Sequence, residues 1–184
     1  MTVAVIYGST RTDGNTEILT RQAVQGLQTE VIYLKDYDIQ PIADQRHADG
    51  GFQDVDDDYP AVLERLLPHD TVVFATPIYW YSMSGRMKNF VDRWSQTLRD
   101  QRYPEFHSDM AGKIAYVIAV GGDEPRIKGL PMIQQFQFIF DFMGMRMDGY
   151  VLGQGNKPGE VLQDLPALAA ARVIRDTLKN REGG

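Results

Sequence analysis

Short runs of apolar residues alternate along this chain with longer segments in which apolar positions recur every three or four residues. The short runs predict β-strands and the longer segments predict α-helices, because side chains repeat with period two in a strand and 3.6 in a helix. The predicted strands are residues 3–7, 31–34, 71–75, 114–120 and 145–152. The predicted helices are residues 16–28, 59–67, 84–99, 131–143 and 161–179, and a long polar connection covers residues 35–58.

The predicted strands lack the alternation of polar and apolar residues that a half-exposed strand shows. Strands of this kind are buried on both faces, as in a parallel sheet covered by helices. Alternating strand–helix units with right-handed crossovers give a three-layer, doubly wound α/β fold. Five parallel strands in this rhythm suit the flavodoxin-like strand order 2-1-3-4-5, which binds ligands beyond the carboxyl ends of the strands. No internal repeat or linker is visible, so residues 1–184 are predicted to form a single domain.

The loop after the first predicted strand has the composition of an anion site. It reads Gly-Ser-Thr-Arg-Thr-Asp-Gly-Asn-Thr at residues 8–16. A helix N-terminus offers unpaired N–H groups to a phosphate, and Ser9, Asn15 and Thr16 add side-chain donors. Arg11 adds a charge that can bind a phosphate bidentately, while Asp13 is expected to point to solvent or to pair with Arg11. The alternative is a plain turn in which Asn15 or Thr16 caps the helix, which leaves Ser9 and Arg11 unexplained.

Three aromatic residues follow the third predicted strand, again at its carboxyl end. The segment reads Thr-Pro-Ile-Tyr-Trp-Tyr-Ser-Met-Ser at residues 76–84. Pro77 stiffens the chain past the strand, Ser82 and Ser84 are candidate helix caps, and large rings at a strand end suit a flat aromatic ligand. The alternative is a surface loop whose aromatic side chains pack on the core or on a partner chain. Together with the anion site, this loop favours an aromatic ring system that carries a phosphate.

Several motifs in order along the chain resemble the NADPH-dependent FMN reductase family of flavodoxin-like proteins. They are the two loops just described, the run Lys-Asn-Phe-x-Asp-Arg from residue 88, and a Gly-Gly pair after the fourth predicted strand. The likeness runs from residue 1 to about residue 150 and implies a flavodoxin-like FMN-binding domain. The family implies FMN with its phosphate at Ser9, Arg11, Asn15 and Thr16. The isoalloxazine would lie on Pro77, Ile78, Tyr79 and Trp80, with Gly121 and Gly122 near its pyrimidine edge.

The resemblance implies an FMN-dependent NAD(P)H oxidoreductase. FMN would take a hydride from NADPH or NADH and pass electrons to a small planar acceptor such as a quinone, a nitroaromatic, an azo compound or free flavin. One flavin domain fills the 184 residues, so donor and acceptor are expected to use the same flavin face in turn, with ping-pong kinetics. Backbone N–H groups would bond the ring edge, and we assign no catalytic acid or base. Glu124 or Arg126 is a candidate guide for the nicotinamide donor.

Composition narrows the chemistry further. The chain has no cysteine, which excludes disulfides, thiolate zinc sites, cysteine-ligated iron–sulfur clusters and a cysteine nucleophile. The chain also resembles iron–sulfur flavoproteins, whose cluster cysteines lie after the second strand, so flavin is the expected redox centre. A net charge of −6 argues against nucleic acid as a partner. No metal site is expected, because His47, His69 and His107 lack ligand spacing and the acidic run 56–58 is expected to cap a helix or to complement its dipole.

The predicted helix 131–143 is apolar around most of its circumference. It carries Phe136, Phe138, Phe140 and Phe142. On the outside of a covered sheet such a helix indicates a subunit interface, so a homodimer or homotetramer is predicted. The alternative is a helix tucked under a neighbouring loop. No apolar run approaches the about 18 residues of a membrane span and no signal peptide is visible, so a cytoplasmic protein without membrane partner is expected.

Two other functions stay open from the sequence. A flavodoxin-type electron carrier would need a charged docking face, for which a net charge of −6 spread along the chain is weak support. Arg11 also suits the reductase family better than the hydroxyl-only phosphate loops of carriers. A flavin-binding sensor without turnover would hold a flavin that neither NADH nor NADPH reduces.

Overall fold

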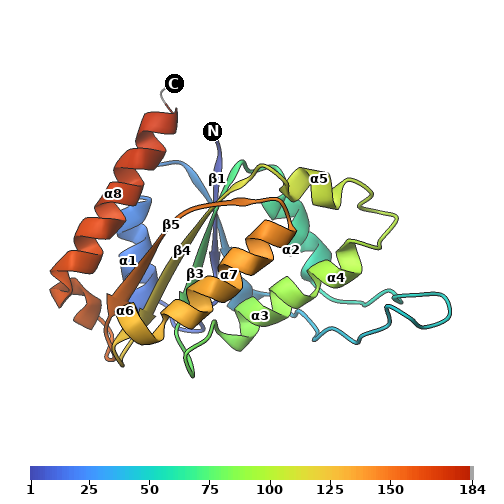
Figure 1. The fold of residues 1–184 in the computed structure, drawn as a ribbon, viewed down its shortest axis with the longest axis horizontal. Helices are drawn as coiled ribbons and strands as arrows, with labels where there is room; N and C mark the ends of the chain where they lie inside the picture. The colour runs from blue at the N-terminus through green and yellow to red at the C-terminus, as the bar shows by residue number, and fades with distance from the viewer. Residues whose placement is uncertain (183–184) are drawn as a thin grey trace.

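Five parallel strands form a central sheet in the computed structural model, which describes residues 1–182 (Figure 1). The strands are β1 Val3–Tyr7, β2 Thr29–Tyr33, β3 Thr71–Pro77, β4 Ile114–Gly121 and β5 Arg146–Gln154. Their order is β2-β1-β3-β4-β5, and each neighbouring pair is parallel. The predicted doubly wound sheet and its strand order are therefore confirmed.

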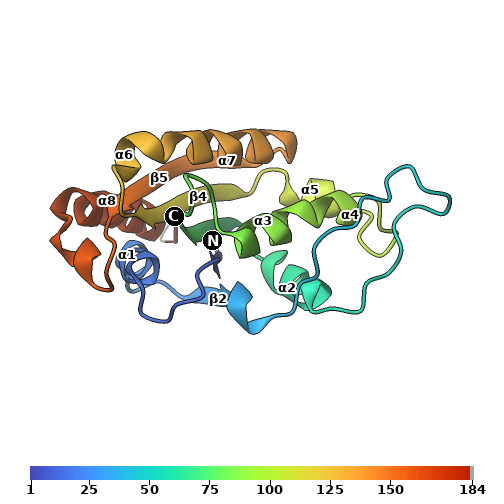
Figure 2. The ribbon, with the colours of Figure 1, turned by 90° about the horizontal axis from the view of Figure 1, so that it is seen from below.

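Helices cover both faces of this sheet. They are α1 Asn15–Ala23, α2 Tyr59–Leu66, α3 Gly85–Asp92, α4 Trp94–Thr97, α5 Phe106–Met110, α6 Pro125–Lys128, α7 Leu130–Phe142 and α8 Leu165–Glu182, with 3-10 turns η1 Leu34–Asp36 and η2 Glu160–Gln163. Figure 1 shows α1 and α8 on one side of the sheet and α2, α3 and α7 on the other. In Figure 2 the connection between η1 and α2 extends away from the side of the molecule that carries α8.

Alternate side chains of the inner strands enter two different cores. Val5 and Val73 pack with residues of α1 and α8, whereas Ile6 and Phe74 pack with residues of α2, α3 and α7. The ring of Phe74 lies 5.0 Å from that of Phe140, measured between centroids. Burial on both faces explains why these inner strands show no polar alternation. The prediction of burial on both faces is wrong for the edge strands β2 and β5, which are partly exposed.

The long helix expected at 84–99 is two helices, α3 and α4, separated at Arg93. The hydroxyl of Thr97 donates to the carbonyl oxygen of Arg93 at 3.3 Å, a contact of the kind that bends helices. The closing helix begins at Leu165 rather than at 161, because the carboxylate of Asp164 accepts the N–H of Ala167 at 3.1 Å and caps it. The short helices α5 and α6 were not predicted, since a single turn shows no periodicity.

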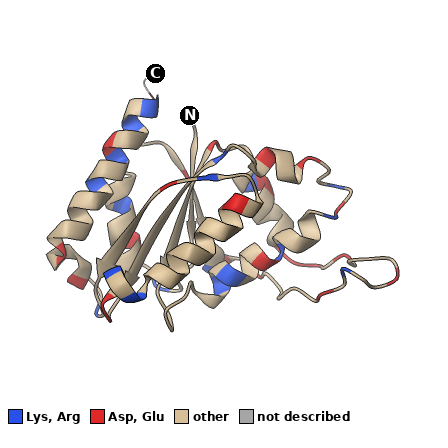
Figure 3. Cartoon of the chain, in the orientation of Figure 1, with Lys and Arg blue, Asp and Glu red and all other residues tan. Residues whose placement is uncertain are grey.

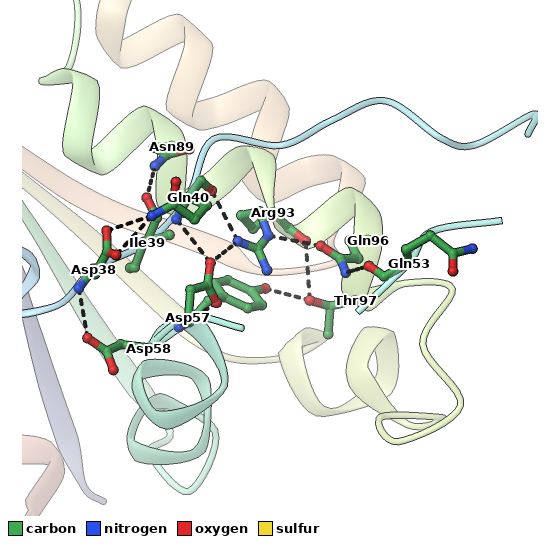
Figure 4. Close-up of polar contacts among 11 residues, drawn as sticks. Asp38, Ile39, Gln40, Gln53, Asp57, Asp58, Asn89, Arg93, Gln96 and Thr97 are labelled. Atoms are coloured by element: carbon green, nitrogen blue, oxygen red, sulfur yellow. Dashed lines mark hydrogen bonds and ion pairs between the residues drawn. The ribbon is translucent and has the colours of Figure 1, made fainter. Parts of the chain in front are cut away.

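Buried polar contacts fasten the connection between η1 and α2 to α3 (Figure 4). The side-chain amide of Asn89 donates to the carbonyl oxygen of Ile39 at 2.5 Å. The buried guanidinium of Arg93 donates to the carbonyl oxygen of Gln40 at 3.0 Å and pairs with the buried carboxylate of Asp57. Asn89 and Arg93 belong to the Lys-Asn-Phe-x-Asp-Arg run, so this motif holds the connection in place.

Asp57 and Asp58, in the acidic run before α2, accept hydrogen bonds from different segments. Asp57 also accepts the N–H of Tyr59 at 3.1 Å, which satisfies one open donor at the start of α2. The N-cap residue Asp58 makes no capping hydrogen bond and instead accepts the N–H of Asp38 at 2.8 Å. Capping is therefore confirmed for Asp57, whereas the side chain of Asp58 joins the two ends of the connection.

Candidate functional site

The loop after β1 turns tightly before α1 begins. The N–H of Arg11 donates to the hydroxyl oxygen of Ser9 at 3.1 Å, which closes the turn over the end of the strand. Gly14 is the N-cap residue of α1, and no side chain caps this helix end. The alternative in which Asn15 or Thr16 caps the helix is therefore wrong, and the N-terminus of α1 remains open to an anion.

Some charged side chains of this loop form ion pairs, and Arg11, within the part of the chain that the structure describes, does not. Asp13, in the left-handed region with φ of 54°, forms an ion pair with Arg21 at 2.8 Å. Arg21 also pairs with the buried carboxylate of Glu17 at 2.7 Å. Among residues 1–182, Arg11 forms no ion pair. The option of an Arg11–Asp13 pair is thus wrong, and the positive charge of Arg11 is not neutralised by the acidic residue beside it.

The carboxylate of Glu17 stabilises the loop by accepting hydrogen bonds. One oxygen accepts the backbone N–H of Asp13 at 2.8 Å, and the other accepts the hydroxyl of Tyr33 at 2.7 Å. The ring of Tyr33 stacks on that of Tyr7 with centroids 4.8 Å apart. Burial raises the pKa of Tyr33, and its hydrogen bond to Glu17 adds to that shift, so the phenol stays a donor at neutral pH.

Ser84 joins the loops after β1 and β3. Its hydroxyl oxygen accepts the N–H of Met87 at 3.2 Å, which confirms Ser84 as the cap of α3, and its O–H donates to the carbonyl oxygen of Gly8 at 2.8 Å. A Cβ at position 8 would lie 2.7 Å from Ser84 Oγ. Glycine at position 8 therefore permits the contact that holds the two loops together.

The aromatic loop after β3 is a two-residue turn. Tyr79 and Ser82 exchange both backbone hydrogen bonds at 3.0 Å, and the two residues between them, Trp80 and Tyr81, have φ of 48° and 64°. Positive φ at both central positions is the type I′ arrangement. The hydroxyl of Tyr81 donates to the carboxylate of Asp123 at 2.9 Å, so the turn is tied to the loop after β4.

A hollow of about 190 Å³ lies where the loops after β1, β3, β4 and β5 meet. It contains nine of the ten residues predicted to bind cofactor, all except Trp80. The lining residues are Ser9, Arg11, Gly14, Asn15, Thr16, Pro77, Ile78, Tyr79, Val120, Gly121, Gly122, Gly155 and Asn156. The parallel sheet brings these segments together because the carboxyl ends of β1, β3 and β4 lie at one edge.

Trp80 lies beside a second hollow of about 370 Å³. Trp80 is 94% exposed. Tyr81 and Asp123 also line this hollow, which shares Ile78, Gly121, Gly122 and Asn156 with the first. The two hollows are therefore contiguous, and we refer to them as the inner hollow (lined by Ser9 and Arg11) and the outer hollow (lined by Trp80 and Tyr81).

The loop after β5 supplies residues that the sequence reasoning missed. Gly155 and Asn156 line the inner hollow. A Cβ at Gly155 would come within 2.8 Å of the Asn15 side-chain nitrogen, so only glycine fits this close approach. That nitrogen donates to the carbonyl oxygen of Lys157 at 2.8 Å, and the Asn15 side-chain oxygen accepts the N–H of Val161 at 3.3 Å. Asn15 thus holds the β5 loop, a role different from the side-chain phosphate donor that we expected. The position of Gly-Asn directly after a fifth strand is the signal that could have been used.

No helix among residues 1–182 is long and apolar enough to span a membrane. No group of three or more His, Cys, Asp or Glu side chains in the same range is placed to hold a metal ion.

Comparison with known proteins gives a family match. The family model for NADPH-dependent FMN reductases matches residues 1–151. A Bacillus subtilis protein named as an NAD(P)H-dependent FMN-containing oxidoreductase, YwqN, is 61% identical over 171 residues, which cover 93% of this chain and 94% of that protein. The iron–sulfur flavoprotein MJ1083 of Methanocaldococcus jannaschii is 30% identical over 190 residues, covering 95% and 93% of the two chains.

Solved structures agree with the fold. The Trp repressor binding protein of Bacillus subtilis is 52% identical, with a TM-score of 0.80 over 94% of this chain and 96% of that one. An FMN-dependent NADH-azoreductase from Bacillus anthracis, in complex with FMN, has a TM-score of 0.64 at 15% identity and covers 97% and 99% of the two chains. At that identity the azoreductase supports the fold alone.

Proposed function

Because the chain belongs to the NADPH-dependent FMN reductase family, an FMN-dependent class of oxidoreductases, we propose that its FMN occupies the inner hollow. The observation that carries this proposal is the convergence of the loops after β1, β3 and β4 on one hollow, with Arg11 not paired to any acid among residues 1–182. That combination of an anion site beside apolar and aromatic residues fits a phosphorylated ring system.

The phosphate would bind at the start of α1. The uncapped helix end offers N–H groups, Ser9 and Thr16 line the hollow beside it, and the Arg11 guanidinium offers a charge-assisted contact. Asn15 would contribute its backbone N–H, because its side-chain amide holds the β5 loop. The pairing of Asp13 with Arg21 supports this proposal, since the nearest acidic residue then adds little repulsion.

The ring system would lie against Pro77, Ile78 and Tyr79. Gly121 and Gly122 also line this hollow, and their lack of side chains lets a ring edge approach the backbone. A Cβ at Gly121 would come within 3.2 Å of the Ile78 side chain, which supports a need for glycine at that position. Backbone N–H groups of Gly121 and Gly122 could stabilise the negative charge that develops on a reduced flavin.

Bound FMN supplies the two-electron chemistry of the reaction. NADPH or NADH would give up a hydride, which carries two electrons and one proton, and leave as the oxidised nucleotide. A quinone acceptor would then gain two electrons and two protons, the second proton coming from solvent. Nitroaromatic and azo compounds and free flavin are acceptors of the same planar class.

Donor and acceptor would use the same opening in turn. The outer hollow adjoins the inner one through four shared residues, so both partners can reach the cofactor from there. Alternating use of one opening leads to ping-pong kinetics, in which lines of reciprocal rate against reciprocal donor concentration are parallel.

A visible spectrum of the purified protein tests the proposal. The protein is expected to be yellow, to release FMN rather than FAD on denaturation, and to bleach when NADPH or NADH is added without oxygen. A colourless protein that binds no added FMN would refute the cofactor assignment. A yellow protein that neither nucleotide reduces would instead be an electron carrier or a flavin sensor.

We also propose that the chain forms a homodimer or homotetramer through α7. Phe136 and Phe140 are buried in the core, but Phe138 and Phe142 are 67% and 71% exposed. Figure 3 shows that α7 carries few charged residues along its length, in contrast to α8. Two exposed phenylalanines one turn apart on a sparsely charged helix support an interface there.

A further inference from the structure

The turn Tyr79–Ser82 places two large aromatic residues in a backbone conformation that disfavours them. Type I′ turns need positive φ at both central positions, which Asn-Gly adopts readily. Here those positions are Trp80 and Tyr81, with φ of 48° and 64°. Bulky residues with positive φ are uncommon and costly, and they persist where the surrounding contacts impose them.

A side-chain contact holds this turn against the loop after β4. The hydroxyl of Tyr81 donates to Asp123 at 2.9 Å, and Asp123 pairs with Lys128 at 2.7 Å. Tyr81 is thereby fixed, whereas Trp80 makes no side-chain hydrogen bond among residues 1–182 and is 94% exposed. The strained turn thus projects an indole ring at the rim of the outer hollow.

The outer hollow has the position that an electron partner needs. Its volume is about 370 Å³, and it shares Ile78, Gly121, Gly122 and Asn156 with the inner hollow. A ring held there would contact the same walls as the proposed cofactor ring. Nothing charged lines the shared wall, because its residues are glycine, isoleucine and asparagine.

We propose that the outer hollow binds an electron-poor planar ring and that Trp80 packs on that ring as an aromatic clamp. This inference rests on the proposed function, since it takes FMN to lie in the inner hollow. An indole is an electron-rich π system, which packs well on electron-deficient rings and attracts cationic ones. Both the nicotinamide ring of an oxidised nucleotide and a quinone ring have this chemistry, and the Tyr81–Asp123 contact holds the turn ready for either.

The test compares three forms of the FMN-loaded, oxidised protein. The Trp80→Asn/Tyr81→Gly double variant supplies the residues that the turn favours, so its melting temperature should equal or exceed that of the wild type. Trp80→Phe keeps an aromatic ring and serves as the matched control. Calorimetric titration with NADP⁺ and, separately, with 1,4-naphthoquinone measures binding without turnover.

We expect the double variant to keep its FMN and to lose about tenfold in affinity for at least one probe, while Trp80→Phe stays close to the wild type. Loss of affinity for NADP⁺ alone identifies a donor ring, loss for naphthoquinone alone an acceptor ring, and loss for both a shared site. Equal affinities of all three proteins for both probes would overturn the inference, and so would a double variant that loses FMN. Wild-type protein that binds no FMN would refute the proposed function instead.

Tryptophan fluorescence gives an independent readout. The chain has two tryptophans, and Trp94 is only 3% exposed, so acrylamide quenching reports mainly on Trp80. NADP⁺ should protect Trp80 from acrylamide in the wild type, and Trp80→Phe should show little quenching with or without it. Quenching of the wild type that no concentration of NADP⁺ alters, despite calorimetric binding, would contradict a clamp on the nicotinamide ring.

Discussion

At the scale of single residues, Arg11 in the loop before α1 and Arg21 in the last turn of α1 have opposite surroundings. Arg21 pairs with Asp13 and Glu17, and its hydrogen bond to Asp13 raises the pKa of its guanidinium. Arg11 has no acidic partner among residues 1–182. Arg21 therefore stabilises the loop, and Arg11 is left to bind an anion.

Replacing Arg11 by alanine should weaken FMN binding. Loss of a hydrogen bond to a charged group costs about 1.5–3 kcal/mol, which corresponds to roughly a 10- to 150-fold rise in the dissociation constant. Fluorescence titration of the apoprotein with FMN measures this dissociation constant. Arg172→Ala, an exposed arginine on α8, is the control and should bind FMN as the wild type does. An unchanged affinity in Arg11→Ala would remove Arg11 from the site.

Replacing Glu17 by glutamine should destabilise the protein. The buried carboxylate accepts hydrogen bonds from the Asp13 N–H, the Tyr33 hydroxyl and Arg21, and a neutral amide cannot serve all three. We expect a loss of about 1–3 kcal/mol in the free energy of unfolding, measured with urea. Tyr33→Phe removes one of these hydrogen bonds and should cost less. A Glu17→Gln protein as stable as the wild type would contradict this role.

At the scale of elements, Asp164 joins the end of β5 to the start of α8. Its carboxylate accepts the N–H of Gln154 at 2.6 Å and that of Ala167 at 3.1 Å, and it pairs with Arg126. Burial acts to raise the pKa of Asp164, but these hydrogen bonds and the arginine together lower it below its usual value. Arg126, a candidate guide for the donor from the sequence, is thus engaged in holding this junction.

The stabilisation from Asp164 should depend on pH. The unfolded carboxyl titrates near about 3.9, so a lower folded pKa adds stability above that pH, and this stability is lost as the pH falls through the folded value. Asp164→Asn should therefore cost about 1–3 kcal/mol at pH 7, and its deficit should shrink below about pH 4. Urea unfolding at several pH values measures the cost at pH 7 and its decrease at low pH. The control is Asp176→Asn, in an exposed ion pair on α8, which should change the free energy of unfolding little at any pH. If the loss of stability in Asp164→Asn does not depend on pH, the ionised carboxylate of Asp164 is not its source.

At the scale of the whole molecule, the two helix layers present different surfaces. Phe138 and Phe142 give α7 an exposed aromatic face, whereas the large apolar residues that α8 and the turn before it expose are the aliphatic Leu162, Leu165 and Val173. Scattered apolar residues are normal on a surface, whereas neighbouring aromatic ones indicate an interaction site.

Replacing Phe138 by glutamate should give monomers. A charge at the centre of the proposed interface is desolvated without a partner, so the molar mass from light scattering should fall to that of one chain, 20.8 kDa. Val173→Glu introduces the same charge on the other layer and should leave the assembly intact. A wild type that is already monomeric, or an assembly that persists in Phe138→Glu, would contradict the proposal.

The local pattern of apolar residues was sufficient to predict the strands and the longer helices. The bounds of β1 were predicted to the residue, and each of the five strands was located. The inner strands β1, β3 and β4 gave the clearest signal, because they are buried on both faces and almost entirely apolar. The division of the helix at Arg93 was missed because the apolar periodicity continues through both helices. The buried ion pair of Arg93 with Asp57, which is far away in the sequence, was missed as well. The sequence predicts that α7 is apolar around most of its circumference, but only the fold separates its buried phenylalanines from its exposed ones.

The sequence by itself determined the sheet, its strand order, the family, the lack of cysteine and most of the residues around the inner hollow. These follow from composition and from short contiguous motifs, which a linear reading can recover. The tertiary structure alone decided that Arg21 rather than Arg11 pairs with Asp13, that Asn15 holds the loop after β5, and that Trp80 lies at a second hollow. The physical reason is that partners and hollows are formed by segments distant along the chain, and only folding brings those segments to one edge of the sheet.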